Sequence, residues 1–111
     1  MAVTTLDLTD KQGGIVDVNH DDGSIVVFGR PMRRFIIKNP LTNSDKVYYT
    51  LGKAGMLGGT LPKTEAVLDA SYPFLIPGED LEFEEPNRQP ETLELLCGNT
   101  KAVTAIRVMK V

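Results

Sequence analysis

The chain carries few side chains that do chemistry: its 111 residues include one histidine, His20, and one cysteine, Cys97. A histidine can act as the base for a cysteine nucleophile, so these two residues are the first candidates for catalysis. Cys97, however, alternates with Leu93 and Leu95 in a β-rich run, where a buried thiol behaves as a small apolar side chain. His20 stands in a turn sequence and lacks the companions that a zinc site needs. We therefore predict neither a catalytic pair nor a metal site here.

An oxygen-rich segment, DVNHDDG at residues 17–23, resembles the opening of a calcium-binding loop. Such a loop requires glycine at its sixth position and an acidic residue at its twelfth, and this chain has Asp22 and Phe28 there. The segment fails both requirements. Asp-Gly between two β-branched runs is a strong hairpin signal, so we predict a hairpin over residues 15–29.

Two further patterns could serve an enzyme but favour other roles. The acidic run of residues 79–85 holds carboxylates of the kind that glycosidases use in pairs. Alternation places Glu82 and Glu84 on the solvent side of one strand, however, and the sequence identifies no second acidic residue that would face them across a substrate.

The glycine-rich segment 52–64 lacks the spacing of a phosphate-binding loop, and we predict a long, mobile contact loop there. The sequence thus predicts no catalytic, cofactor-binding or metal-binding residues, and no enzyme.

Composition narrows the classes of partner. Twelve basic and fifteen acidic residues give a net charge of −3, which argues against a general nucleic-acid-binding face. The longest apolar run, residues 25–28, is far shorter than the roughly 20 residues that span a bilayer. The first residues lack the pattern of a signal peptide, and one cysteine cannot form an intrachain disulfide. We expect a chain that folds in a reducing cytoplasm and binds neither nucleic acid directly nor a membrane.

Short β-rich runs alternate with Asn-Pro, Pro-Gly and Gly-Asn breakers through most of the chain. This spacing predicts an all-β fold, a small antiparallel β-sandwich or jelly-roll-like barrel. Residues 14–111 would form its single domain, and residues 1–13 an N-terminal arm or an edge strand. Residues 65–71 could form either one helical turn or a short strand. Beyond the hairpin, the predicted strands are 33–38, 47–51, 81–84, 93–97 and 102–111.

The last predicted strand is apolar on both faces, which is unusual for a strand with one solvated side. One face carries Val103, Ala105, Arg107, Met109 and Val111, and the other carries Ala102, Thr104, Ile106, Val108 and Lys110. We expect both faces to be covered. The cover would be the chain's own loops, which we favour, or the surface of a partner.

Four segments carry a resemblance to a known family: FIIKNP from Phe35, VYYTLG from Val47, PFLIPGEDLEF from Pro73 and VTAIRVMKV from Val103. They resemble small virion proteins of tailed bacteriophages, and in particular the capsid decoration proteins (staple or cement proteins) of epsilon-fifteen-like podoviruses. The resemblance covers about residues 33–111.

The resemblance implies a jelly-roll-like β fold outside the capsid, in a protein without catalytic residues. Such a protein is a homodimer that binds the major capsid protein across capsomer junctions and strengthens the shell against internal DNA pressure. It would be made in the cytoplasm of the host bacterium and would end on the outer surface of the virion.

We expect the partner-binding residues to be those that are exposed or mobile. Arg33 and Arg34 form a basic cluster with Arg30, and the planar donors of arginine suit carboxylates on a partner. The expected contact residues are Leu6, Leu8, Arg33, Arg34, Met56, Leu57, Val108 and Val111.

Two other functions stay open at this point. A carbohydrate-binding module would stack sugars on exposed aromatic rings, for which Tyr48, Tyr49 and Tyr72 are available beside four phenylalanines. A tail or neck accessory protein of the same phage class would use the same fold.

Overall fold

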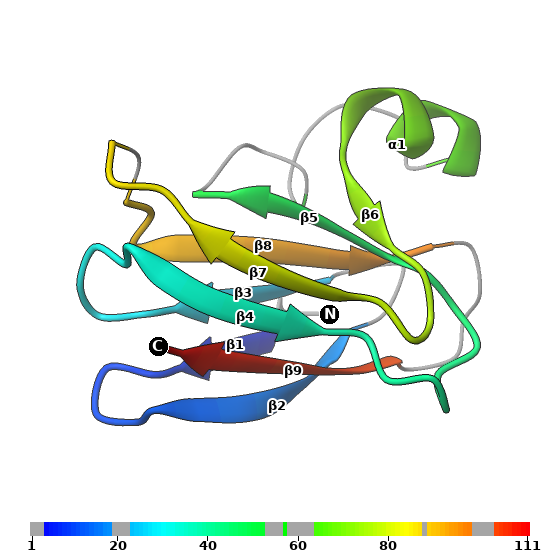
Figure 1. The fold of residues 1–111 in the computed structure, drawn as a ribbon. Helices are drawn as coiled ribbons and strands as arrows, with labels where there is room; N and C mark the ends of the chain where they lie inside the picture. The colour runs from blue at the N-terminus through cyan, green and yellow to red at the C-terminus, as the bar shows by residue number, and fades with distance from the viewer. Residues whose placement is uncertain (1–3, 19–22, 53–56, 58–63, 88, 99–103) are drawn as a thin grey trace.

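The computed structural model describes residues 4–18, 23–52, 57, 64–87, 89–98 and 104–111, and its strands form two sheets packed face to face (Figure 1). The first sheet has the order β1-β3-β8-β5-β6, formed by Thr4–Asp7, Ser24–Val27, Thr92–Cys97, Val47–Leu51 and Phe74–Leu75. The second sheet has the order β2-β9-β4-β7, formed by Gly13–Val18, Thr104–Lys110, Arg34–Lys38 and Asp80–Glu84. The predicted β-sandwich is confirmed, and the sheets do not close into a barrel.

The core lies between the two sheets and is built from alternate residues of the strands. In β7, for example, Leu81 and Phe83 face inward while Glu82 and Glu84 are exposed, as the sequence alternation predicts. The Phe35 ring packs between the rings of Phe28 and Phe83, with centroids 4.9 and 4.7 Å apart. Each fully buried aliphatic or aromatic side chain contributes roughly 1.5–3 kcal/mol through removal from water. The fully buried set includes Leu8, Val18, Val26, Phe28, Phe35, Ile37, Leu93, Leu95, Ile106 and Val108.

The predicted hairpin over residues 15–29 is wrong. Strand β2 pairs with β9 in the second sheet, while β3 pairs with β1 and β8 in the first, so the chain crosses from one sheet to the other. The Ser24 hydroxyl donates a hydrogen bond of 2.9 Å to the Asp17 carbonyl and ties the two ends of this crossing together. Alternating β-branched residues specify which side of a strand is buried, and a crossing between sheets satisfies the same pattern as a hairpin.

The N-terminal segment joins the sandwich through an edge strand. Strand β1 pairs in parallel with β3, whereas the other strand pairs are antiparallel. After it, Leu8 turns into the core, and its backbone N–H donates to the Val27 carbonyl at 2.8 Å. Residues 4–13 are therefore part of the domain, and residues 1–3 lie outside the described part of the chain.

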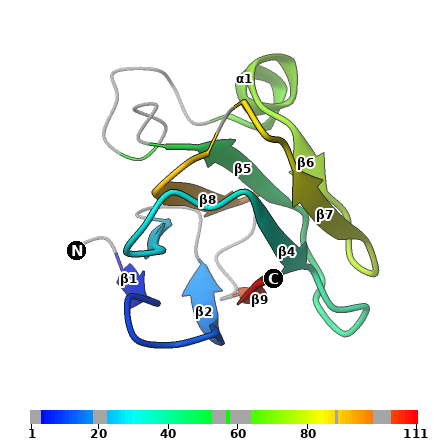
Figure 2. The same cartoon turned by 60° about the vertical axis from the view of Figure 1, so that its left-hand side comes forward.

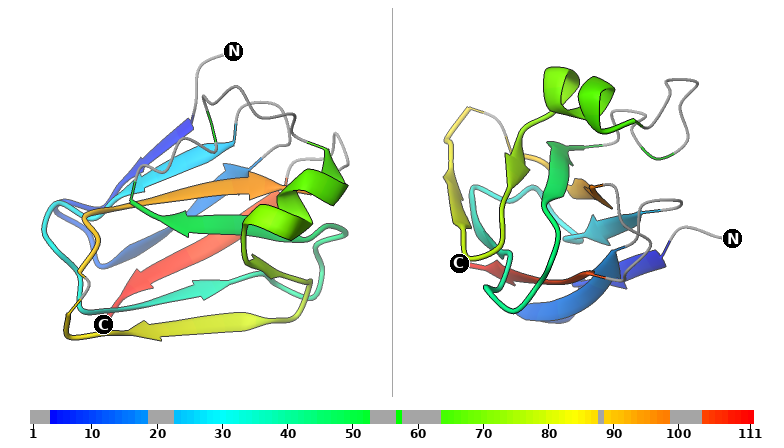
Figure 3. Two further views of the ribbon diagram at one scale, coloured as in Figure 1. Left: turned by 90° about the horizontal axis from the view of Figure 1, so that it is seen from above. Right: turned by 90° about the vertical axis from the view of Figure 1, so that its right-hand side faces the viewer.

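Residues 65–71, whose sequence allows either a helical turn or a strand, form the helix α1 (Glu65–Ser71). Thr64 caps it by accepting a hydrogen bond from the Val67 N–H at 3.4 Å. Its Leu68 packs with Tyr48 and Leu96 on the outer face of the first sheet. The helix therefore covers the side of that sheet which faces away from the second sheet (Figure 3). No helix of the described residues is both long and apolar enough to cross a membrane.

Candidate functional site: the open face of the second sheet

The outer faces of the two sheets differ in what covers them. Helix α1 lies over the first sheet, whereas no described helix or loop lies over the outer side of β2, β9, β4 and β7 (Figures 2 and 3). We call this outer side the open face. Its outward side chains are Ile15, Asp17, Ala105, Arg107, Met109, Arg34, Ile36, Lys38, Asp80, Glu82 and Glu84.

The openness corrects one expectation about the last strand. The inward face of β9 packs in the core through Ile106 and Val108, as its apolar character requires. On its outward face Arg107 is exposed while Ala105 and Met109 are half-buried, so the described residues cover this face only in part. The second explanation, that a partner covers this face, stays a prediction.

Strand register brings the open-face side chains together from distant parts of the sequence. One row across the sheet reads Ile15, Arg107, Lys38 and Asp80, and the next reads Gly13, Met109, Ile36 and Glu82. The apolar side chains Ile15, Ala105 and Met109 thus lie on the β2 and β9 side of the face, beside the charged Asp17 and Arg107. Acidic side chains line β7, which forms one edge of the sheet.

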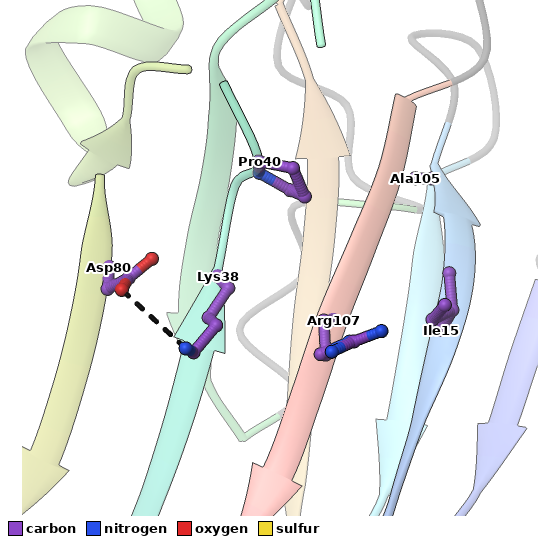
Figure 4. Close-up of a pocket in the computed structure, with 6 residues that line it drawn as sticks. All are labelled: Ile15, Lys38, Pro40, Asp80, Ala105 and Arg107. Atoms are coloured by element: carbon purple, nitrogen blue, oxygen red, sulfur yellow. Dashed lines mark ion pairs between the residues drawn. The ribbon is translucent and has the colours of Figure 1, made fainter. Parts of the chain in front are cut away.

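Two of the cationic side chains on the open face form ion pairs with acidic side chains of β7, and Arg107 does not. Arg34 lies 3.6 Å from Glu82 and 3.5 Å from Glu84, and Lys38 lies 3.9 Å from Asp80. Arg107 makes no ion pair with any described residue. In Figure 4 its side chain points away from Lys38 and toward Ile15 on the neighbouring strand. The open face therefore presents one arginine whose charge is unmatched within the described part of the chain.

A shallow hollow lies beside this arginine. Its walls are Ile15, Lys38, Pro40, Asp80, Ala105 and Arg107, and its volume is about 210 Å³ (Figure 4). Sites that bury a small molecule usually measure about 300–1,000 Å³. This hollow alone could therefore take a single inserted side chain. A second, more open hollow of about 510 Å³ continues along Arg107 toward Gly13 and Met109.

The loop after β4 shapes one end of the hollow. The buried Asn39 side chain donates to the carbonyls of Asp45 at 3.1 Å and Leu75 at 2.9 Å. Asn43 in turn donates to Asn39 Oδ1 and to the Ala105 carbonyl, each at 2.8 Å. These bonds fix the predicted Asn39-Pro40 turn against the start of β9.

Three of the expected contact residues come together at one end of the second sheet. Arg33 directly precedes β4 and Arg34 begins it, and the Val111 N–H donates to the Arg34 carbonyl at 3.2 Å. All three are exposed, and with Arg30 they line a further hollow. The structure therefore groups these three beside the open face, and their contact with a partner stays a prediction.

The other expected contact residues do not offer an exposed surface. Leu8 and Val108 are fully buried and Leu57 is 8% exposed, so the exposure expected for Leu8 and Leu57 is wrong. Leu6 is half-buried and packs against the core. The inward parity of Val108 in β9 and the turn after β1 put Val108 and Leu8 between the sheets, whereas Leu57 packs with Tyr48, Leu68 and Leu96 on the outer face of the first sheet. Met56, most of the predicted loop 52–64 and His20 lie outside the described residues.

Sequence reasoning missed Ile15, Ile36, Arg107 and Met109 as members of one surface. The available signal was the alternation of the last strand, which places Arg107 and Met109 on one face. The hairpin prediction included Ile15, and its pairing with Arg107 across the β2–β9 register could not be read from local pattern.

A second polar cluster joins α1 to β5. Lys46 Nζ lies 2.8 Å from both Glu65 and Asp69, and the Tyr48 hydroxyl donates to Asp69 at 2.6 Å. Hydrogen bonds from Lys46 and Tyr48 lower the pKa of Asp69, and bonds to Asp69 and Glu65 raise the pKa of Lys46 above its usual range. Burial raises the pKa of Tyr48 to about 12.

The pKa values of Asp69, Lys46 and Tyr48 are all shifted away from neutral pH, whereas a general acid or base works best with a pKa near the operating pH. We therefore interpret the cluster as a clamp that docks the helix. Among the described residues, no group of three His, Cys, Asp or Glu side chains could hold a metal ion.

Comparisons with protein-family models, with curated proteins and with solved structures found no match for this chain.

Proposed function

We propose that this chain is a structural virion protein that binds the outer surface of a tailed-phage capsid and staples neighbouring major capsid proteins. It acts by binding rather than by catalysis, and it stabilises the shell against the pressure of the packaged DNA. The observation that carries the proposal is the open face of the second sheet, with the unmatched Arg107 at its centre.

The composition of the open face supports a protein partner. Ile15 is 57% exposed and adjoins Ala105 and Met109, so an apolar zone lies beside charged side chains. Apolar patches rimmed by polar residues mark interaction surfaces, and arginine is enriched at the centres of protein interfaces. A partner that covered this zone would give the second sheet the outer cover that α1 gives the first.

The segments that carry the family resemblance correspond to elements around this face. FIIKNP is β4 with its Asn39-Pro40 turn, PFLIPGEDLEF spans β6 and β7, and VTAIRVMKV contains β9. Three of the four open-face strands therefore lie in the resembling segments. A capsid presents many copies of one site, so a weak contact of this kind gains strongly when two copies bridge neighbouring subunits.

The tyrosines do not favour the carbohydrate-binding alternative. Tyr48 is fully buried beneath α1, and Tyr72 packs half-buried in the same cluster. The exposed ring of Phe74 is covered by the Lys46 ammonium group, 4.6 Å from its centroid. The open face itself carries no aromatic side chain among the described residues, so a stacking platform for sugars is not formed there.

Co-sedimentation tests the proposal. The purified protein is mixed with undecorated mature shells of the phage that encodes it and, separately, with unassembled major capsid protein. We expect saturable binding to shells at a fixed stoichiometry and much weaker binding to the unassembled subunit. Absence of binding to shells would overturn the proposal, and binding to purified tails or necks instead would support the accessory-protein alternative.

A homodimer is part of the staple hypothesis, because bridging two capsid subunits across a two-fold axis requires two copies. Sedimentation equilibrium tests whether the protein is a dimer, both for the protein alone and for the protein released from shells.

A further inference from the structure

We propose that the hollow beside Arg107 receives a carboxylate side chain of the capsid protein, while apolar side chains around that carboxylate cover Ile15 and Met109. This inference rests on the proposed function, which identifies the capsid protein as the partner that supplies the carboxylate. It adds the chemistry of the contact and the residues of this chain that make it.

The first step of the argument is charge. The open face carries three cations, and the acids of β7 accompany two of them: Arg34 has Glu82 and Glu84, and Lys38 has Asp80. Arg107 has no such companion among the described residues, although Lys38 stands next to it across the sheet. The Lys38 ammonium group is directed to Asp80, so among the described residues of this face Arg107 is the cation left for an incoming carboxylate. Phosphate-rich nucleic acid would meet the acidic row of β7 at the same face.

The second step is geometry. The guanidinium group is a planar fork of N–H donors that matches a carboxylate with two parallel hydrogen bonds. Figure 4 shows the Arg107 side chain lying along the hollow toward Ile15, rather than folded against Lys38. A carboxylate that binds this guanidinium group would therefore lie on the β2 side of β9, beside Ile15.

The third step is the apolar surround. Ile15, Ala105 and Pro40 form walls of the hollow, and Met109 continues the surface along β9. When a partner covers these side chains, water leaves the site and the charge pair operates in a medium of lower dielectric constant. An arginine ringed by apolar contacts that exclude water is the arrangement found at energetic centres of interfaces.

The test measures binding of five variants to undecorated shells by co-sedimentation. Arg107→Glu, Arg107→Lys and Ile15→Asp change the hollow. Ile76→Asp is the matched control, because Ile76 is 51% exposed, close to the 57% of Ile15. Arg30→Glu tests the other basic cluster, where Arg30 is an exposed arginine. Urea unfolding of each variant establishes that the fold is retained.

We expect Arg107→Glu to weaken binding by at least about 30-fold, since the reversed charge faces the partner's carboxylate. Arg107→Lys keeps the charge but loses the fork, so its loss should be smaller. Ile15→Asp should also weaken binding, and the Ile76→Asp control should stay within about 3-fold of wild type, as expected for a side chain outside the contact. An acid-to-arginine change in the capsid protein that restores binding of Arg107→Glu would identify the carboxylate.

Other outcomes separate this inference from the proposed function. If wild-type protein binds shells and Arg107→Glu and Ile15→Asp bind equally well, the inference fails while the function stands. Loss of binding in Arg30→Glu alone would move the contact to the arginine cluster and overturn the inference. A change in self-association without a change in shell binding would assign the open face to a second copy of the chain and would likewise overturn the inference. Failure of wild-type protein to bind shells would overturn the function and the inference together.

Discussion

The ammonium group of Lys110, near the end of β9, donates a hydrogen bond to the backbone carbonyl of Leu8, which follows β1. The bond joins the two sheets at positions 102 residues apart in the sequence. Lys110 is only 8% exposed, and its backbone exchanges hydrogen bonds with Gln12: its N–H donates to the Gln12 carbonyl at 2.8 Å, and Gln12 Nε2 donates to its carbonyl at 2.7 Å. A buried lysine thus closes the sandwich at this corner.

Lys110→Met should destabilise the fold. Methionine keeps the apolar stem but removes the charged donor, and the Leu8 carbonyl then retains the hydrogen bond from the Lys11 N–H at 3.1 Å. Loss of a hydrogen bond from a charged group costs about 1.5–3 kcal/mol. The urea midpoint should fall with an unchanged slope. Lys38→Met is the control, because its ion pair is exposed and worth about 0–1 kcal/mol. Equal losses in the two variants would show that the Lys110 bond adds nothing.

The Asp69 clamp should make the free energy of unfolding depend on pH in the acidic range. Hydrogen bonds from Lys46 and Tyr48 lower the pKa of Asp69 in the folded protein, so the folded state binds this proton less readily than the unfolded chain. The contribution is therefore present above the unfolded value of about 3.9 and is lost as pH falls through the lower folded pKa. Asp69→Asn should flatten the fall of the urea midpoint below pH 4. An unchanged slope would contradict the clamp interpretation.

Tyr48 should contribute to the loss of stability at alkaline pH, together with Lys46, whose pKa is also raised. Its pKa is raised to about 12 by burial, above the ordinary value of about 10. Stability from this group is therefore present below pH 10 and is lost as pH rises toward 12. Tyrosinate absorbance of the folded protein should show one group that ionises last, and Tyr48→Phe should remove that step. Ionisation of all three tyrosines below about pH 11 in the folded protein would refute this assignment.

Gly23 and Gly52 form a matched pair for testing the crossing between the sheets. Both have positive φ, 65° and 74°, so alanine at either position incurs the left-handed strain of about 1–2 kcal/mol. A Cβ on Gly23 would also lie 2.5 Å from the Leu95 carbonyl oxygen, whereas one on Gly52 meets no described atom within 4 Å. Gly23→Ala should therefore lower the urea midpoint clearly more than Gly52→Ala. Similar effects of the two changes would mean that the crossing can shift to accept a side chain.

Most of the strands could be predicted because a strand with one buried side alternates in sequence. Glu82 and Glu84 with Leu81 and Phe83 are the clearest case, and β4 alternates in the same way. Strands β5 and β8 were also predicted, although residues on both of their faces are buried. The sequence did not decide between helix and strand for α1, because seven residues are too few to show a helical period. Its cap, Thr64, was the local signal for a helix start.

The pairing of the strands was harder to predict from the sequence, because alternation determines which side chains face inward and not which strand lies alongside. The sequence interpretation therefore placed Ile15 in a hairpin, whereas its neighbour in the sheet is Arg107. The same limitation hid the open face, which forms only when β9 is inserted between β2 and β4. The exposure expected for Leu8 failed for a related reason, since an edge strand can send its next residue into the core.

The central position of β9 has a consequence for how fast the chain folds. Strand β9 pairs with β2 through contacts such as Gly13 with Met109, and with β4 on its other side. Neither pairing can form before the intervening chain closes a long loop, and the entropy of that closure is lost before any contact stabilises the pair. The first sheet faces a similar delay in pairing β3 with β8. Topologies dominated by such distant pairings fold in about milliseconds to seconds, so we expect refolding of this sandwich in that range.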